Sequence, residues 1–143
     1  MLILETNNIT TYRLPIKKTT AVLRFAQKTL KVSEKQLISF AFVTEAIIKK
    51  NNRVYRGKDK VTDVLSFGSA LQTVMPGEAI GEILICPKRA QKQAEELGHS
   101  FEQEIATLGL HGYLHIMGFD HEIDADAEKM EKLERRILKN FYD

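Results

Sequence analysis

The stretch "HGYLHIMGFDH", residues 111–121, limits strongly how this chain can fold. It holds three of the four histidines of the chain, in the spacing His-x-x-x-His-x-x-Gly-x-x-His. Residues four apart lie one turn apart on the same helix face, so His111 and His115 project toward a common point. Gly118 can adopt the left-handed conformation that ends a helix. The spacing therefore predicts a helix through His115, a turn at Gly118, and a return of His121 toward the other two imidazoles.

Three converging imidazoles predict a metal site. Imidazole nitrogen is a preferred zinc ligand and also suits iron, nickel and copper. A zinc ion with three protein ligands keeps a fourth position for water or substrate, which is the catalytic pattern. Each histidine taken alone is more commonly a core or surface residue, but the combined spacing favours metal. We therefore predict one Zn²⁺ ion, or another divalent transition metal, on His111, His115 and His121.

Two acidic residues are candidates to support these ligands. Asp120 directly precedes His121 and would orient a ligand or accept a proton; an exposed turn aspartate is the alternative. Glu104 lies two turns before His111 on the same helix face, and an ordinary helix glutamate is the alternative there. Both residues stay candidates at this stage.

The residue after the first histidine argues against a peptidase. Zinc peptidases with this spacing carry a glutamate there, which takes a proton from water and passes it to the poor amine leaving group. This chain has Gly112 instead. Phosphodiester cleavage needs only metal assistance and a cation near the developing negative charge. Gly112 therefore opposes a peptidase and is compatible with a phosphodiester substrate.

The length and composition predict one globular domain, residues 1–143. Hydrophobic residues make up 43% and charged residues 28% of the chain, an ordinary balance for a folded protein. No apolar run approaches the roughly 20 residues that span a bilayer, and Glu5 interrupts the N-terminal apolar stretch too early for a secretion signal. Cys86 is the only cysteine, so no internal disulfide can form. We expect a cytoplasmic protein that does not bind membranes.

Apolar periodicity and end signals predict an alternation of strands and helices. The helix that carries the histidines, from Ser100 to Gly118, is apolar nearly all round, which predicts that it runs through the core. Intermixed elements predict the α+β class. The expected strands cover 1–5, 37–44, 61–68 and 79–86, and the other expected helices cover 15–30, 44–51, 87–97 and 124–139.

A basic stretch, "KKNNRVYRGKDK" at residues 49–60, has a local net charge of +5, from six cations and Asp59. The net charge of the whole chain, +2, is too small to indicate a nucleic-acid binder by itself. The local cluster would suit a phosphate backbone, with Tyr55 available to stack on a base. A solvated turn is the alternative explanation of these charges.

Three segments in order resemble the YbeY family of bacterial metal-dependent endoribonucleases, which act in ribosomal RNA maturation. The resemblance extends from about residue 40 to 135 and rests on "NNRVYRGKDKVTDVLSF", "GEILICPKRAQKQAEELGHSFEQE" and "LHGYLHIMGFDHE". It implies that His111, His115 and His121 are zinc ligands. It also implies that Arg56, within N-x-x-Y-R-G-K-D, is the arginine important for RNA cleavage. Glu82 and Gly68 depart from the family's commoner Asp and Pro at those positions.

The resemblance implies a fold and partners as well. The expected fold is metalloprotease-like (zincin-like), with a small mixed β-sheet and helices packed around a central helix that bears the histidines. The implied substrate is single-stranded RNA, and the implied role is processing of the 3′ end of small-subunit ribosomal RNA together with ribosome quality control. The implied partners are therefore ribosomal RNA and the small ribosomal subunit.

These observations combine into one hypothesis, the hydrolysis of single-stranded RNA with Arg56 on the scissile phosphate. Further RNA contacts are expected from the same basic stretch, at Lys49, Arg53, Tyr55, Lys58 and Lys60. A non-enzymatic, ribosome-associated protein with a structural zinc is one alternative, and a metallopeptidase is the other. The attacking group, water or the RNA 2′-hydroxyl, stays open.

Overall fold

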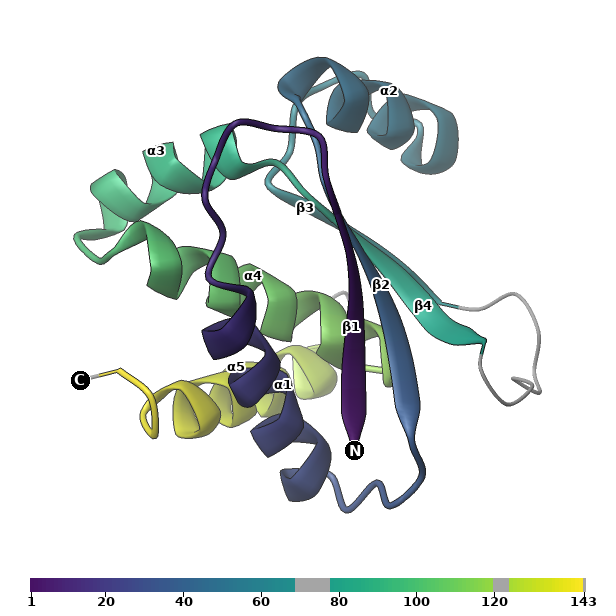
Figure 1. Cartoon of the computed structure of the whole chain (residues 1–143), viewed down its shortest axis with the longest axis vertical. Coiled ribbons are helices and arrows are strands. Elements are labelled where there is room, and N and C mark those ends of the chain that lie inside the picture. The colour runs from purple at the N-terminus through teal and green to yellow at the C-terminus, as the bar shows by residue number, and fades with distance from the viewer. Residues whose placement is uncertain (69–77, 120–123, 143) are drawn as a thin grey trace.

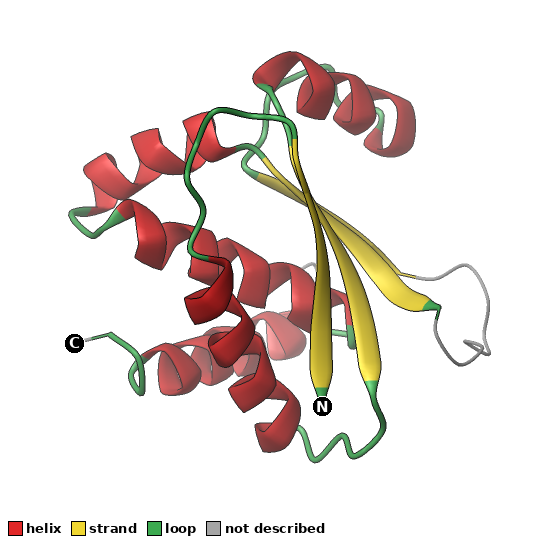
Figure 2. Ribbon diagram, viewed as in Figure 1, coloured by secondary structure: helices red, strands yellow, loops and turns green. Residues whose placement is uncertain are grey.

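A computed structural model of the chain describes residues 1–68, 78–119 and 124–142. These residues form a small α+β fold, as the intermixed sequence signals predict (Figures 1 and 2). The strands are β1 (Leu2–Asn8), β2 (Gln36–Phe42), β3 (Val64–Gly68) and β4 (Ala79–Ile85). The helices are α1 (Ile16–Thr29), α2 (Glu45–Arg56), α3 (Pro87–Leu97), α4 (Phe101–Ile116) and α5 (Asp124–Leu138).

The four strands form one mixed sheet in the order β1-β2-β4-β3. β1 pairs parallel with β2, and β2 pairs parallel with β4. β3 pairs antiparallel with β4, with Ser66 opposite Ile83, and it occupies the edge of the sheet. The mixed sheet implied by the family resemblance is therefore present, and one side of β3 is left for contacts outside the sheet.

The two faces of the sheet are covered unequally. Side chains alternate between the faces of a strand, so in β4 Ile83 and Ile85 join the large core while Leu84 joins a smaller one. The large core includes residues of α1, α3, α4 and α5. The smaller core includes Ile48 of α2. Figure 1 shows α2 separated from the other four helices by the sheet.

Helix α4 is buried over most of its length, as its apolar sequence predicts. Its start is capped by Ser100, whose Oγ accepts a hydrogen bond from the backbone N of Gln103 at 3.1 Å. A Cβ added at Gly112 would lie 3.0 Å from Ile83 Cδ1, so glycine lets the backbone of α4 approach β4 closely. Gly118, with φ of 105°, turns the chain just beyond the helix. The sheet thus holds the helix that carries His111 and His115.

Helix α2 is longer than the sequence signals predict. It was expected to end at Asn51, but it continues to Arg56 and stops at Gly57, which has φ of 70°. Asn52 stays helical because its side chain is buried and its Nδ2 donates to the backbone O of Lys60 at 3.0 Å. Residues 49–56 of the basic stretch are therefore helical, and residues 57–60 form a loop tied back to the helix.

No helix in the described parts of the chain is both long and apolar enough to cross a bilayer. Cys86, at the start of α3, is fully buried beside the smaller core. Burial raises the pKa of its thiol above the usual value. The cysteine therefore serves packing rather than chemistry.

Candidate functional site

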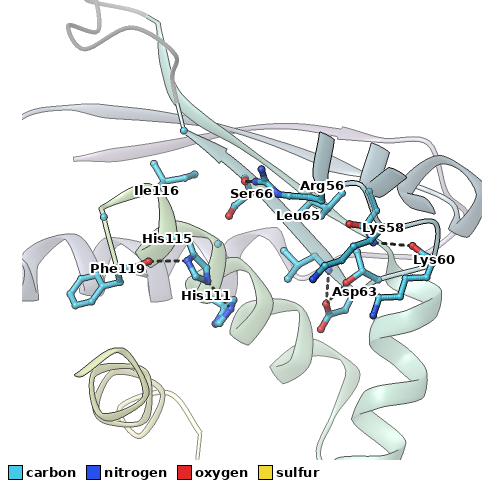
Figure 3. Close-up of a pocket in the computed structure, with 16 residues that line it drawn as sticks. Arg56, Lys58, Lys60, Asp63, Leu65, Ser66, His111, His115, Ile116 and Phe119 are labelled. Carbon is cyan, nitrogen blue, oxygen red and sulfur yellow. Dashed lines mark hydrogen bonds between the residues drawn. The ribbon is translucent and has the colours of Figure 1, made fainter. Parts of the chain in front are cut away.

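A cleft of about 800 Å³ lies between the end of α2, the edge strand β3 and the last turns of α4. It brings residues from distant parts of the sequence together (Figure 3). His111 and His115 lie side by side on α4, and the basic side chains come from the end of α2 and the loop after it. The cations that line the cleft are Arg56, Lys58 and Lys60.

The two histidines are each held through the ring nitrogen Nδ1. His111 Nδ1 lies 2.8 Å from Oε1 of Glu134 on α5, and His115 Nδ1 lies 2.9 Å from the backbone O of Phe119. A carboxylate and a carbonyl are acceptors, so each Nδ1 carries the proton of its hydrogen bond. Each Nε2 then presents a lone pair, and the two Nε2 atoms lie 3.0 Å apart.

This arrangement fits a transition metal. A cation bound by both Nε2 atoms would take the place of the direct contact between them. Zinc–nitrogen bonds of about 2.0–2.1 Å at the tetrahedral angle set two ligand nitrogens about 3.3 Å apart, close to the 3.0 Å found here. Hydrogen bonds from Nδ1 to a carboxylate and a carbonyl are also the partners that metal-binding histidines usually have. The donors and their orientation therefore suit the predicted site.

Two of the predicted site residues, His121 and Asp120, lie outside the described residues. Among the described residues, no group of three histidine, cysteine or acidic side chains surrounds one metal position. The two imidazoles on α4 are thus the part of the predicted ligand set that the structure places, and the third ligand stays a prediction.

Arg56 connects α2 to the edge strand. Its Nη2 donates to the backbone O of Ser66 at 2.6 Å, and its guanidinium carbon lies 4.8 Å from the centre of the Phe67 ring. The hydrogen bond and the aromatic ring together limit how far this long side chain moves. The charge of Arg56 is thereby held on the wall of the cleft, which His111 and His115 also line.

The predicted RNA-binding residues divide into two groups. Lys58 and Lys60 line the cleft, on the loop held by Asn52. Lys49 and Arg53 are exposed on α2 and are not among the described residues that line it. Tyr55 is 62% exposed, and its ring packs edge-on against Phe67 with 5.4 Å between ring centres. Only part of the basic stretch therefore faces the histidines.

Glu104, a candidate to support the metal ligands, contacts His99 in the structure. Glu104 is buried, and its Oε1 lies 2.9 Å from His99 Nε2, in the turn before α4. It does share a helix face with His111, but seven residues correspond to about 10 Å along the helix axis. That separation exceeds the reach of a hydrogen bond, so Glu104 secures the start of α4 instead.

Among the described residues, Glu134 is the acidic side chain that contacts a site histidine, and the sequence pattern did not single it out. Its signal was present: Met130 and Ile137 are the buried residues of α5, and Glu134 falls between them on the same face. A carboxylate on the apolar face of a helix needs a partner. The sequence does not say which element supplies that partner.

The electrostatic character of the cleft is positive. Three cationic side chains line it, and the described acidic residue in the lining is Asp63. The Oδ1 of Asp63 accepts hydrogen bonds from the backbone N of Val64 at 2.8 Å and from Thr62 Oγ1 at 3.2 Å. Asp63 thus has a local structural role. The described lining of the cleft therefore attracts anions.

The sequence of this chain is similar to those of known proteins. A sequence model of the family described as "Endoribonuclease YbeY" matches residues 5–142, which extends the resemblance toward the N-terminus. A Staphylococcus carnosus protein named Endoribonuclease YbeY is 43% identical, over 84% of this chain and 82% of that protein. A Staphylococcus aureus protein of the same name is 40% identical, with the same coverage of both chains.

One solved structure has a similar fold. The solution structure of TM1509 from Thermotoga maritima superposes with a TM-score of 0.60 at 27% sequence identity, covering 99% of this chain and 91% of that one. The sequence matches and the fold agree with one another. The chain belongs to the YbeY family.

Proposed function

We propose that this protein is a metal-dependent endoribonuclease that cuts single-stranded RNA during ribosomal RNA processing. Family membership supports the endoribonuclease activity and its role in ribosomal RNA processing. The observation that carries the chemistry is the meeting, in one positive cleft, of the paired His111 and His115 Nε2 atoms with Arg56. The proposed metal is Zn²⁺.

His111 and His115 would hold the metal together with His121. A zinc ion bound there would supply Lewis-acid polarisation of a phosphoryl oxygen. The contribution of the protein itself is orientation: Glu134 and the Phe119 carbonyl hold the two rings with Nε2 toward the cleft. Because α4 is buried against the sheet, these donors sit on a rigid element.

Arg56 would bind the scissile phosphate. A guanidinium has five N–H donors, and Ser66 O accepts from one of its nitrogens, so others can form a two-point contact with phosphate. Its charge would stabilise the negative charge that develops on the phosphoryl oxygens as the phosphodiester bond breaks. Lys58 and Lys60 would bind neighbouring phosphates along the strand.

The finer features of the proposal concern the form of the RNA, its source and the partners. A single strand would run past Arg56 with one base near the exposed ring of Tyr55, since base stacking on an aromatic ring requires an unpaired base. We extend the proposal to the 3′ end of small-subunit ribosomal RNA as substrate, to the small ribosomal subunit as partner, to ribosome quality control, and to a cytoplasmic location. We also extend the proposal to a metalloprotease-like (zincin-like) fold, because the helix that bears the histidines packs against a mixed sheet with an antiparallel edge strand.

A peptidase function is opposed by the surroundings of Gly112. A Cβ at this position would lie within 3.1 Å of three Ile83 side-chain atoms, so position 112 faces the packed sheet. A glutamate there would have to displace the core before it could act as a base. The non-enzymatic alternative is a zinc protein that only binds the ribosome. A measurement of RNA cleavage distinguishes it from the proposed endoribonuclease.

The test uses purified protein of known metal content and a labelled single-stranded RNA. We expect the wild type to cut the RNA, and His115→Ala and Arg56→Ala to lose cleavage. Equal cleavage by all three proteins would identify a contaminating nuclease and contradict the proposal. A zinc-loaded wild type that binds RNA without cutting it would favour the non-enzymatic alternative, and turnover of casein would favour the peptidase.

A further inference from the structure

Helix α5 carries an acidic side chain, Glu134, on its apolar face. Met130 and Ile137 of this helix are buried, and Leu133 packs against the same core. Glu134 lies between Met130 and Ile137 in sequence and on the same side of the helix. Its side chain is only 19% exposed. The other glutamates of α5 are exposed. The position of Glu134 therefore calls for a specific partner, because burying a charged group without one is costly.

That partner is His111. Glu134 Oε1 lies 2.8 Å from His111 Nδ1, across the interface between α4 and α5. A histidine ring has two nitrogens, and the hydrogen bond at one of them decides which carries the proton. With the proton on Nδ1, the lone pair is on Nε2, which faces the Nε2 of His115.

The two histidines obtain the same tautomer from different sources. The acceptor for His115 is the backbone O of Phe119, four residues along the chain in the turn that follows α4. The acceptor for His111 is a side chain 23 residues away on a separate helix. The orientation of His115 is thus local, whereas the orientation of His111 depends on the docking of α5.

We propose that Glu134 is a positioning residue of this site: it fixes His111 in the tautomer and ring orientation that present Nε2 to the metal. The inference deepens the proposed function and rests on it for the role of the metal. The fixed tautomer itself is a property of the metal-free protein, so it can be tested separately. Docking of α5 is then a condition for a complete site.

The first experiment measures the histidine tautomers in metal-free protein by ¹⁵N-detected NMR of the imidazole rings. In the wild type, the His111 signals should show a protonated Nδ1 and an unprotonated Nε2. In Glu134→Ala this preference should be lost, while His115 keeps its tautomer because Phe119 O is unchanged. A wild-type His111 with the proton on Nε2 would overturn the inference, as would an unchanged tautomer in Glu134→Ala.

The second experiment measures Zn²⁺ affinity by competition with a chromophoric chelator. Loss of a partner of this kind typically weakens metal binding about 10–100-fold, and we expect that range for Glu134→Ala. Glu134→Gln keeps an acceptor oxygen without its charge, so its affinity should be intermediate. Glu131→Gln is the matched control, because Glu131 is exposed on the same helix and its pair with Arg135, at 3.3 Å, is also exposed. Its affinity should equal that of the wild type.

The outcomes separate the inference from the proposed function. Thermal unfolding of each metal-free variant checks that α5 is still docked, and Glu134→Gln, which preserves the shape of the side chain, serves if Glu134→Ala does not fold. If the wild type cuts RNA and binds zinc but the Glu134 variants bind it within about twofold of the wild type, the inference fails and the proposed function stands. If the wild type binds no zinc, the role in metal binding is overturned together with the metal part of the proposed function, whatever the tautomers are.

Discussion

The Nη2 of Arg56 donates a hydrogen bond to the backbone O of Ser66 across 2.6 Å, and this contact joins the last residue of α2 to the edge strand β3. Helix α2 packs on the face of the sheet with the smaller core, and this contact holds the Arg56 guanidinium at the sheet edge, in the cleft that contains the histidines of α4. The edge position of β3 makes this possible, since the carbonyl of an inner strand would be bonded to a neighbouring strand.

Replacing Arg56 with alanine should lower RNA cleavage by about 10²–10³-fold, the usual cost of removing one group that stabilises developing charge. The metal content should be unchanged, because the described contacts of Arg56 are with Ser66 and Phe67 and not with the histidines. Arg136→Ala, on the exposed side of α5, removes the same charge and should cut RNA at the wild-type rate. Full activity of Arg56→Ala would remove Arg56 from the proposed site.

Lysines of the cleft should matter more for RNA binding than lysines of the α2 surface. Each phosphate contact with a single strand contributes about 0.7 to the slope of log affinity against log salt concentration. The double variant Lys58→Ala/Lys60→Ala should therefore lower the slope by about 1.4, whereas Lys49→Ala, outside the cleft lining, should change it less. Fluorescence anisotropy over a salt series measures this. A larger effect at Lys49 would place the RNA along α2 instead.

Zinc should stabilise the folded protein if His115 helps to bind it. A ligand that binds only the native state adds about 2.7 kcal/mol when its concentration is 100 times its dissociation constant. Wild-type protein should therefore melt at a higher temperature with zinc than with a chelator, and His115→Ala should lose most of that difference. Calorimetry with and without zinc compares the two proteins; an equal shift in both would point to binding elsewhere.

Gly112→Ala should destabilise the fold. Alanine favours a helix over glycine by about 1 kcal/mol, but its Cβ would lie 3.0–3.1 Å from three side-chain atoms of the fully buried Ile83. Overpacking of this kind typically costs about 1–3 kcal/mol, so we expect a net loss measured by urea unfolding. Gly68→Ala is the control, because nothing lies within 4 Å of a Cβ there. Gly112→Glu should be less stable still and should not cleave casein.

The protein should lose stability in alkali through Tyr113. Burial raises the pKa of this phenol to about 12, and its Oη donates to Gln36 Oε1 at 2.7 Å. In the unfolded chain this tyrosine ionises at about pH 10. The stability that the neutral phenol contributes to the fold is therefore complete below about pH 10 and is lost as the pH rises toward about 12. Tyr142, whose pKa burial also raises, adds a further dependence in the same direction.

The measurement is the free energy of unfolding between pH 9 and about 12. Tyr113→Phe should start less stable, by about 1 kcal/mol for the lost hydrogen bond, and should depend less on pH over this range. An identical pH dependence in the two proteins would show that Tyr113 is not the group responsible.

Local features were predictable from the sequence because they depend on the backbone geometry of a few neighbouring residues. The cap at Ser100, the stops at Gly98 and Gly118, and the common helix face of His111 and His115 are all of this kind. The end of α2 was misjudged because the buried hydrogen bond of Asn52 to Lys60 is a contact with a later loop. Even this short-range error came from packing.

The sequence by itself therefore determined the α+β class, the paired imidazoles on one helix and the local concentration of positive charge at residues 49–60. Only the tertiary structure decided that β3 lies at the sheet edge, that Arg56 and Lys58 face the histidines while Lys49 does not, and that Glu134 rather than Glu104 contacts His111. The physical reason is that the periodicity of a helix or strand states which residues share a face. The element that meets this face depends on how all the apolar surfaces of the chain pack together.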